Sequence, residues 1–304
     1  MEIRAYDPSM ADELAVLYNR AVSGTPHCYP TAVEELAAAI ARVRGQADSD
    51  PPLRDKAALV AVDHGNAVGF ADTAIGRPHD GESRVECGVF PFFWYEPGRR
   101  AVGQALLDAA ETRLQQLGAR AIQAFPQEYK YDCYHLHSAY LSDHLAHVGA
   151  LLALNGYRRT RGEVYYDWPD FEPVEPPPAG VEVDVAVEWR AGRDKRPNLS
   201  LVAHRAGKEI GCCYCDACSD WVSAADAADW FMTCWLCVEE SHQGLGLGKH
   251  LLRRALVEMR GAGFRHAAIS TALGNDRASV FYSNFGYRFC DWTYGLKRDL
   301  PPGA

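Results

Sequence analysis

Apolar and polar residues alternate with two different periods along the chain, and their order predicts a protein that mixes strands and helices. Residues 1–6 alternate as in a short strand, and residues 12–22 and 31–44 carry apolar side chains at helical spacing. Thr31 with Glu34 three residues later predicts a capping box at the start of the second helix. The other elements predicted in this half are a hairpin of 57–63 and 67–75, a strand at 85–91, a helix at 101–117 and a strand at 120–125.

The same order of elements returns in the second half of the chain. The predicted elements are a strand at 181–189, a hairpin of 199–205 and 209–214, a strand at 230–238, a helix at 248–260, a strand at 267–271, a helix at 278–285 and a strand at 289–296. Between the halves, residues 172–180 hold four prolines, which disfavour regular secondary structure. We therefore predict two domains, 1–171 and 181–304, joined by a proline-rich linker at 172–180.

Individual residues repeat as well as the pattern, which indicates two copies of one unit. One set recurs 145 positions later: Gly103, Leu106, Leu107, Gly118 and Arg120 correspond to Gly248, Leu251, Leu252, Gly263 and Arg265. A second set recurs 130 positions later, where Gly156-Tyr157-Arg158 corresponds to Gly286-Tyr287-Arg288. The two offsets differ because residues 127–147 form an insertion in the first copy.

Composition narrows the classes of function. The chain has 304 residues, 48% hydrophobic and 23% charged, which excludes disordered and fibrous classes, and its net charge of −9 argues against a nucleic-acid partner. The negative charge instead suits a cationic small-molecule acceptor. No signal-peptide pattern or membrane-length apolar run is found, so we expect a cytoplasmic protein, no membrane partner, and ten cysteines kept as reduced thiols. The sequence does not specify an oligomeric state.

The motif with the clearest chemistry follows the predicted strand at 230–238. Gln243-Gly244-Leu245-Gly246-Leu247-Gly248 forms a glycine-rich turn that opens an amphipathic helix. Glycines there let backbone N–H groups surround an anion, and the helix N-terminus adds partial positive charge. A dinucleotide fold would place a longer motif after its first strand, and a plain glycine turn is the other alternative.

A second block, Asn275-x-x-Ala278-x-x-Phe281-Tyr282-x-x-x-Gly286-Tyr287, follows the next strand. Together the two blocks resemble the GNAT superfamily of acetyl-CoA-dependent acetyltransferases. The resemblance covers nearly the whole second half and, more loosely, the first, so it implies an α/β (α+β) protein of two GNAT-like domains. Each would be a mixed, mostly antiparallel sheet flanked by helices. The family's mycothiol synthase has a similar layout, but no residue here identifies mycothiol as a substrate.

The resemblance implies roles for particular residues. The backbone N–H of Val238 would polarise the thioester carbonyl, and Tyr282 would act as general acid toward the departing thiolate. The strand end at Cys237 and Val238 would pair with the pantetheine amides. The coenzyme A contacts would come from Cys237, Val238, Gln243, Gly244, Leu245, Gly246, Leu247, Gly248, Lys249, Asn275 and Phe281.

The general base is left open by the sequence. Many relatives carry a Glu six residues before the equivalent of Val238, where this chain has Met232. Asp229 is the nearby alternative we carry forward, beside Asp226, Glu239 and Glu240. An amine that is already neutral would need no dedicated base.

The first copy lacks the corresponding chemistry. Leu145, Leu151 and Leu152 stand where the second copy has Asn275, Phe281 and Tyr282, and a leucine cannot donate a proton. Ala101 aligns with Gly246, although aligning Arg100-x-x-Gly103-x-Ala105 restores a formal motif match. We therefore predict a degenerate first domain and a catalytic second one. The second copy lacks the first copy's two opening helices, and the aromatic and histidine-rich insertion at 127–147 is either a wall of the acceptor site or a surface excursion.

A zinc-like spacing, Cys215-x2-Cys218-x15-Cys234-x2-Cys237, is also found in the chain. Residues three apart in a strand face opposite sides, so Cys234 and Cys237 are not expected to converge on a metal. We interpret the cysteines as core residues and expect no metal.

The sequence thus predicts direct transfer of an acetyl group from acetyl-CoA to a primary amine of a small molecule. Two alternatives stay open. One is a non-catalytic acyl-CoA-binding or regulatory module, and the other is an acetyltransferase acting on a protein or peptide.

Overall fold

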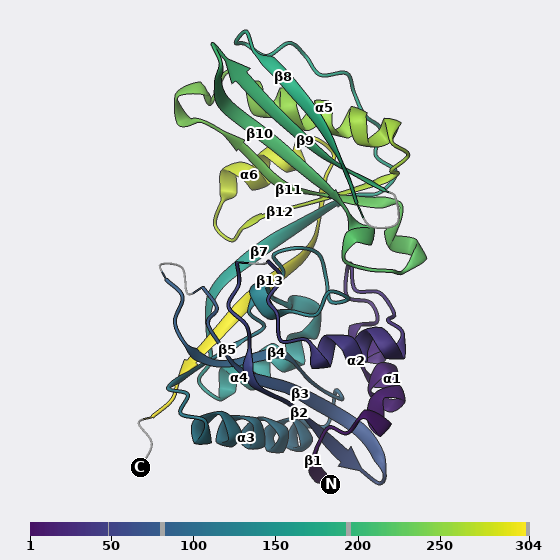
Figure 1. Cartoon of the computed structure of the whole chain (residues 1–304), viewed down its shortest axis with the longest axis vertical. Coiled ribbons are helices and arrows are strands. Elements are labelled where there is room, and N and C mark those ends of the chain that lie inside the picture. The colour runs from purple at the N-terminus through teal and green to yellow at the C-terminus, as the bar shows by residue number, and fades with distance from the viewer. Residues whose placement is uncertain (48, 80–82, 193–195, 302–304) are drawn as a thin grey trace. The chain divides into compact units, whose positions relative to one another are not determined.

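A computed structural model describes residues 1–47, 49–79, 83–192 and 196–301 (Figure 1). The chain divides into two compact units: the first is Met1–Glu163 with Asp291–Ala304, and the second is Val164–Cys290. This division differs from the predicted boundaries at 171 and 181. The last strand of the chain returns to the first unit, where its residues Leu296–Asp299 pair with Ala121–Ala124.

The first unit is a mixed sheet flanked by helices. The strand order is β1-β2-β3-β4-β5-β13, antiparallel except for the parallel pair β4 and β5. The elements are β1 (Glu2–Ala5), α1 (Ala11–Val22), α2 (Val33–Ala41), β2 (Arg54–Asp63), β3 (Asn66–Gly76), β4 (Cys87–Tyr95), α3 (Arg100–Gln116), β5 (Ala121–Ala124), β6 (Leu141–Ser142), α4 (Ala146–Leu154), β7 (Arg158–Trp168) and β13 (Arg288–Asp299). β7 and β13 run side by side (Figure 1), and each is divided between the two units.

The second unit repeats this plan with fewer helices. From β7 its sheet continues in the order β12-β11-β10-β9-β8; β12 and β11 are parallel, and the pairs from β11 to β8 are antiparallel. Its elements are β8 (Asp184–Ala191), β9 (Pro197–Arg205), β10 (Lys208–Ala217), β11 (Trp230–Val238), α5 (Leu247–Gly261), β12 (His266–Ala272) and α6 (Asp276–Ser283). α5 lies against one face of the sheet (Figure 1), and Leu251, Leu252 and Leu256 pack there with Leu199 and Leu201.

The predicted fold class, two α/β domains with mixed and mostly antiparallel sheets, is confirmed. Details differ at helix ends. α2 begins at Val33, and Glu35, not Glu34, accepts hydrogen bonds from Ala32 N and Thr31 Oγ1. The predicted helix at 31–44 ends at Ala41, because Arg42 is already extended.

Three elements had no prediction: β6, which has only two residues, α4 and β7. α4 is apolar on every side, so it has no helical stripe, and β7 carries charged residues that weaken its strand pattern. Among the described residues, no helix combines the length and apolarity needed to span a membrane.

Candidate functional site

The site in the second unit begins where β11 and β12 separate. The two strands pair in parallel from Trp230–His266 to Thr233–Ile269, and β11 continues for five more residues, to Val238. A bulge in the pairing with β10 lies at the same point, between Tyr214 and Cys215. The last five residues of β11 therefore face a gap on the β12 side.

The backbone donors of β11 can be assigned from the antiparallel register. Glu239 N donates to Ile210 O at 2.9 Å, and Val238 is opposite Gly211. Because hydrogen-bonded and non-hydrogen-bonded pairs alternate, the N–H groups of Leu236 and Val238 point away from β10 and toward the gap. These are the donors that an amide-containing chain would meet on entering the gap as an added strand.

Beyond β11 the glycine-rich turn leads into α5. Gly244 and Gly246 have φ of +78° and +80°, a conformation that favours glycine, and open space lies where a Cβ would stand at either position. No side chain of the described residues caps α5, and its first backbone bond runs from His250 N to Gly246 O at 3.0 Å. The N–H groups of Leu247, Gly248 and Lys249 precede that bond and are donors without an intrahelical acceptor, as an anion site requires.

α6 forms the other side of the site. Asn275 is its N-cap and accepts a hydrogen bond from Ala278 N at 3.3 Å, so this side chain orients the helix start. Tyr282 is buried in the last turn and contacts the rings of Tyr166, Phe281 and Tyr287. The helix thereby fixes the position of a phenol beside the gap.

These elements enclose a cavity of about 590 Å³. Its lining contains most of the predicted site residues: Val238, Gln243, Gly244, Gly246, Leu247, Gly248, Lys249, Asn275, Phe281 and Tyr282. Four lining residues had no prediction: Leu236, His242, Arg277 and Ala278. Leu236 could have been found from its period-2 spacing to Val238, whereas the other three are brought in by the loop and by α6.

The cavity is basic although the chain is acidic. Its charged side chains are Lys249 and Arg277, with His242 beside them, and no Asp or Glu among the described residues lines it. Gln243 Nε2 donates to Val238 O at 3.0 Å, which ties the loop to the strand end. A cavity with cationic side chains and free helix donors suits a polyanionic ligand.

Three predicted site residues lie outside this lining. The side chain of Cys237 lies on the opposite face of β11, where Cys237 is paired with Cys212. The carbonyl of Leu245 accepts a hydrogen bond from Gly180 N at 2.8 Å. Asp229 precedes the first residue of β11, at the end far from Val238, and its carboxylate is 3.1 Å from Arg196 Nη2.

Glu239 follows Val238 directly but is not part of the cavity lining. Glu239 forms an ion pair with Lys208 at 2.8 Å, and the hydrogen bond from Lys208 lowers the pKa of Glu239. Met232, at the position where the resemblance to the GNAT superfamily implies Glu, is buried. The geometry therefore does not bring a carboxylate to the cavity among the described residues.

The cysteines of the zinc-like spacing occupy separate environments. Cys215 and Cys218 are fully buried, Cys234 donates to Asp216 Oδ2 at 3.3 Å, and Cys237 is exposed.

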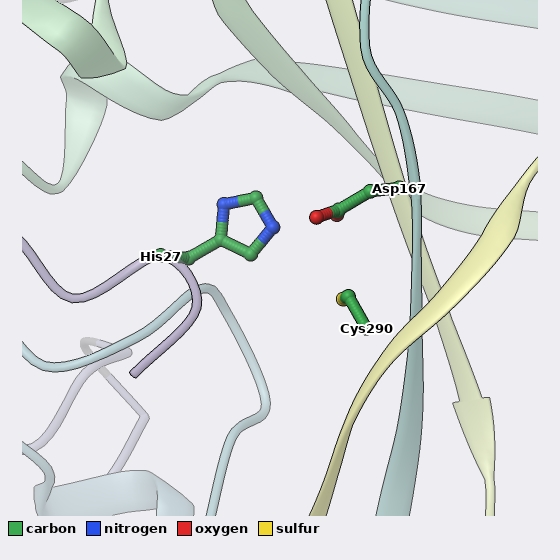
Figure 2. A group of neighbouring side chains, drawn as sticks. All are labelled: His27, Asp167 and Cys290. Atoms are coloured by element: carbon green, nitrogen blue, oxygen red, sulfur yellow. The ribbon is translucent and has the colours of Figure 1, made fainter. Parts of the chain in front are cut away.

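In the second unit, Asp167 on β7 and Cys290 on β13 do come together, with ligand atoms within 4.8 Å (Figure 2). The third side chain drawn there, His27, belongs to the first unit.

Comparisons with known proteins agree with this geometry. Residues 196–289 match the family model described as an acetyltransferase (GNAT) domain. A tandem GNAT protein from the clavulanic acid biosynthesis pathway, solved without AcCoA, has a TM-score of 0.68 and 14% identity, with 100% of this chain and 99% of that chain covered. A GCN5-related N-acetyltransferase from Sphaerobacter thermophilus has a TM-score of 0.62 and 14% identity, with 100% and 96% covered. No curated protein matches the sequence.

Proposed function

We propose that the GNAT domain of the second unit, matched at residues 196–289, transfers an acetyl group from acetyl-CoA directly to a primary amine of a small molecule. The observation that carries this proposal is the basic cavity, about 590 Å³, formed by the end of β11, the start of α5 and α6. The tandem GNAT fold extends over the whole chain, but the described chemistry is concentrated in this unit.

The residues present fit acetyl-CoA. The left-handed glycines leave open space in front of the uncapped N–H groups of α5, where a diphosphate would be held with help from Lys249 and Arg277. Leu236 and Val238 would hold the pantetheine arm through their N–H groups. When bound, acetyl-CoA supplies an activated acyl group.

Groups of the chain itself would stabilise the developing charge and protonate the leaving thiolate. A backbone N–H of Val238, or of Leu236 one step deeper in the gap, stabilises negative charge on the carbonyl oxygen. The N–C bond forms as the C–S bond breaks, and Tyr282 donates its proton to the thiolate. Because no carboxylate among the described residues lines the cavity, the amine arrives neutral. After attack it gives up its proton to solvent, from which the Tyr282 phenolate is reprotonated. Positioning supplies much of the rate.

The lack of a carboxylate base among the described residues that line the cavity also favours a second candidate function, a non-catalytic module that binds acyl-CoA. Met232 and the distant Asp229 are consistent with that reading, whereas Tyr282 beside the gap favours catalysis. An acceptor on a protein or peptide is the third alternative, and no observation here singles it out.

The test combines binding and turnover with the full chain. Isothermal titration with acetyl-CoA should show micromolar binding, and thiol release should depend on an added amine from a panel of aminoglycosides, polyamines, amino acids and peptides. Binding without amine-dependent thiol release would support the non-catalytic module. Absence of both would reject the assignment.

A further inference from the structure

The second unit leaves part of one sheet face uncovered. In the first unit, α1 and α2 lie between the first strand and the hairpin, but in the second unit the described residues between Val181 and Pro197 form only β8. α5 packs on the face that carries Leu199, Leu201 and Cys213. On the opposite face Trp235 is 58% exposed, and Cys237 is exposed too.

The antiparallel register arranges this uncovered face in rows. Trp235 is directly opposite Tyr214, which is opposite Ser200, which is opposite Glu188. Directly opposite residues share a face, so the side chains of Trp235 and Tyr214 project from the same face of the sheet, next to the gap of β11. Leu236, whose N–H faces the gap, is the next residue after Trp235.

Carboxylates accompany these rings. Asp184 and Glu209 are both opposite His204, so with Glu188 they belong to the same face, and none of the three forms an ion pair with another described residue. A hydrogen bond with Cys212 is the main cause that raises the pKa of Tyr214 to about 12, and the charge of Glu209 contributes to it. Glu209 lies on the same face as Tyr214, since Glu209 is opposite His204 where Tyr214 is opposite Ser200. The remaining acid of this face, Asp216, is paired with Arg190 at 3.1 Å.

Aromatic rings beside an unpaired carboxylate favour an organic cation. The nitrogen that attacks a thioester must be uncharged at that moment, so these groups select a second ammonium that does not react. We propose that the acceptor is a short diamine. One nitrogen enters the gap at Leu236, and the other, still protonated, lies over Trp235 and Tyr214 near Glu209. This inference rests on the proposed function and adds its substrate class.

The experiment compares 1,4-diaminobutane with 1-aminobutane in the full chain, by acetyl-CoA-dependent thiol release. The wild type should have at least 10-fold higher kcat/KM for the diamine. Trp235→Ala and Glu209→Gln should each reduce that ratio by roughly 3- to 10-fold, and Trp235→Phe should retain most of it. Trp189→Ala is the matched control, because Trp189 is 42% exposed and shares the other face with Leu199.

Equal kcat/KM for the two amines would overturn the proposal, and so would a Trp235→Ala ratio equal to that of Trp189→Ala. A calorimetric titration of 1,4-diaminobutane into the protein with coenzyme A separates this from the proposed function. If no amine is turned over, diamine binding that Trp235→Ala weakens would still support the cation site. Absence of binding would reject it.

Discussion

The two units share one framework, but only one of them leaves its gap open. In each, the first strand of the parallel pair extends five residues beyond the last paired residue, to Tyr95 in the first unit and to Val238 in the second. In each, the next residue donates back to the preceding hairpin strand, as Glu96 N to Val68 O and Glu239 N to Ile210 O. The repeat is therefore real in three dimensions as well as in sequence.

The contents of the gap differ. A Cβ on Gly248 would meet Val238 Cγ2 at 3.6 Å, an ordinary contact, whereas a Cβ on Gly103 would lie 2.6 Å from the ring of Tyr95. Tyr95 also donates to His147 O at 3.1 Å, and His147 Nε2 is 2.9 Å from Tyr95 O. Side chains of the first unit thus fill the space that corresponds to the cavity of the second unit.

The loop after the extended strand and the N-cap of the later helix also differ between the two units. Gly103 follows Glu96 by seven residues and Gly248 follows Glu239 by nine, so the first loop is two residues shorter. Leu145 is the N-cap of α4 where Asn275 caps α6, and the buried Leu152 occupies the place of Tyr282. A shared fold is maintained by core packing, whereas a ligand site also needs space and donors. The predictions below test this contrast.

The largest effect is expected from Gly246→Asp. An aspartate at this N-cap accepts hydrogen bonds from the α5 N–H groups and places negative charge where the diphosphate would bind. The affinity for acetyl-CoA should fall by at least about 100-fold, as measured by calorimetric titration. The matched control is Gly98→Asp, at another glycine with positive φ and open space around it, which should bind normally. Equal losses in both variants would contradict the assignment of the site to the second unit.

Tyr282→Phe should reduce kcat by about 100-fold and leave the KM for acetyl-CoA within about twofold. Only the proton donor is removed, and general acids contribute on the order of 10²-fold or more. Steady-state thiol release measures both constants. Tyr287→Phe, at the neighbouring buried ring outside the cavity lining, is the control. A Tyr282→Phe enzyme with undiminished turnover across the pH range would exclude the phenol as general acid.

The two helix glycines should respond oppositely to alanine. Gly103→Ala forces a Cβ into the Tyr95 ring and should destabilise the protein by about 2 kcal/mol. Gly248→Ala should be neutral or stabilising by up to about 1 kcal/mol, because the space is free and alanine favours a helix. Thermal unfolding compares the two variants. A loss of stability in both would mean that the second gap is filled as well.

Low pH should lower the free energy of unfolding of the first unit through protonation of His135. Burial lowers its pKa to about 4, and a hydrogen bond with Asp291 opposes that shift. Since the pKa in the unfolded chain is about 6.5, unfolding takes up a proton between these values, so the free energy of unfolding falls as the pH drops from about 6.5 toward 4. The loss is about 3 kcal/mol. His135→Gln should flatten this part of a stability-against-pH curve, and an unchanged slope would contradict the assignment.

The smallest effect is expected from Asp229→Asn. The carboxylate is paired with Arg196 at the far end of β11, so kcat should change by no more than about twofold. A fall of more than about 10-fold, with normal acetyl-CoA binding, would instead identify Asp229 as the base. Rates measured from pH 6 to 9 would show the lost ionisation.

The sequence by itself determined the repeat, the mixed sheets and most of the cavity lining. Helical and strand periods are local properties, and Gly244, Gly246 and Asn275 are required by backbone conformations that follow directly from the motif. The same local information identified Leu152 as unable to replace Tyr282.

Only the tertiary structure decided which groups meet. The return of β13 to β5 moved the boundary of the units, because strand pairing between residues far apart in the chain leaves no periodic signal. The distance of Asp229 from the cavity follows from the length of β11. Tyr95 fills the first gap, and Trp235 is exposed beside the second. Both outcomes depend on the face of the strand that each residue occupies, and that face is set by the register across the sheet.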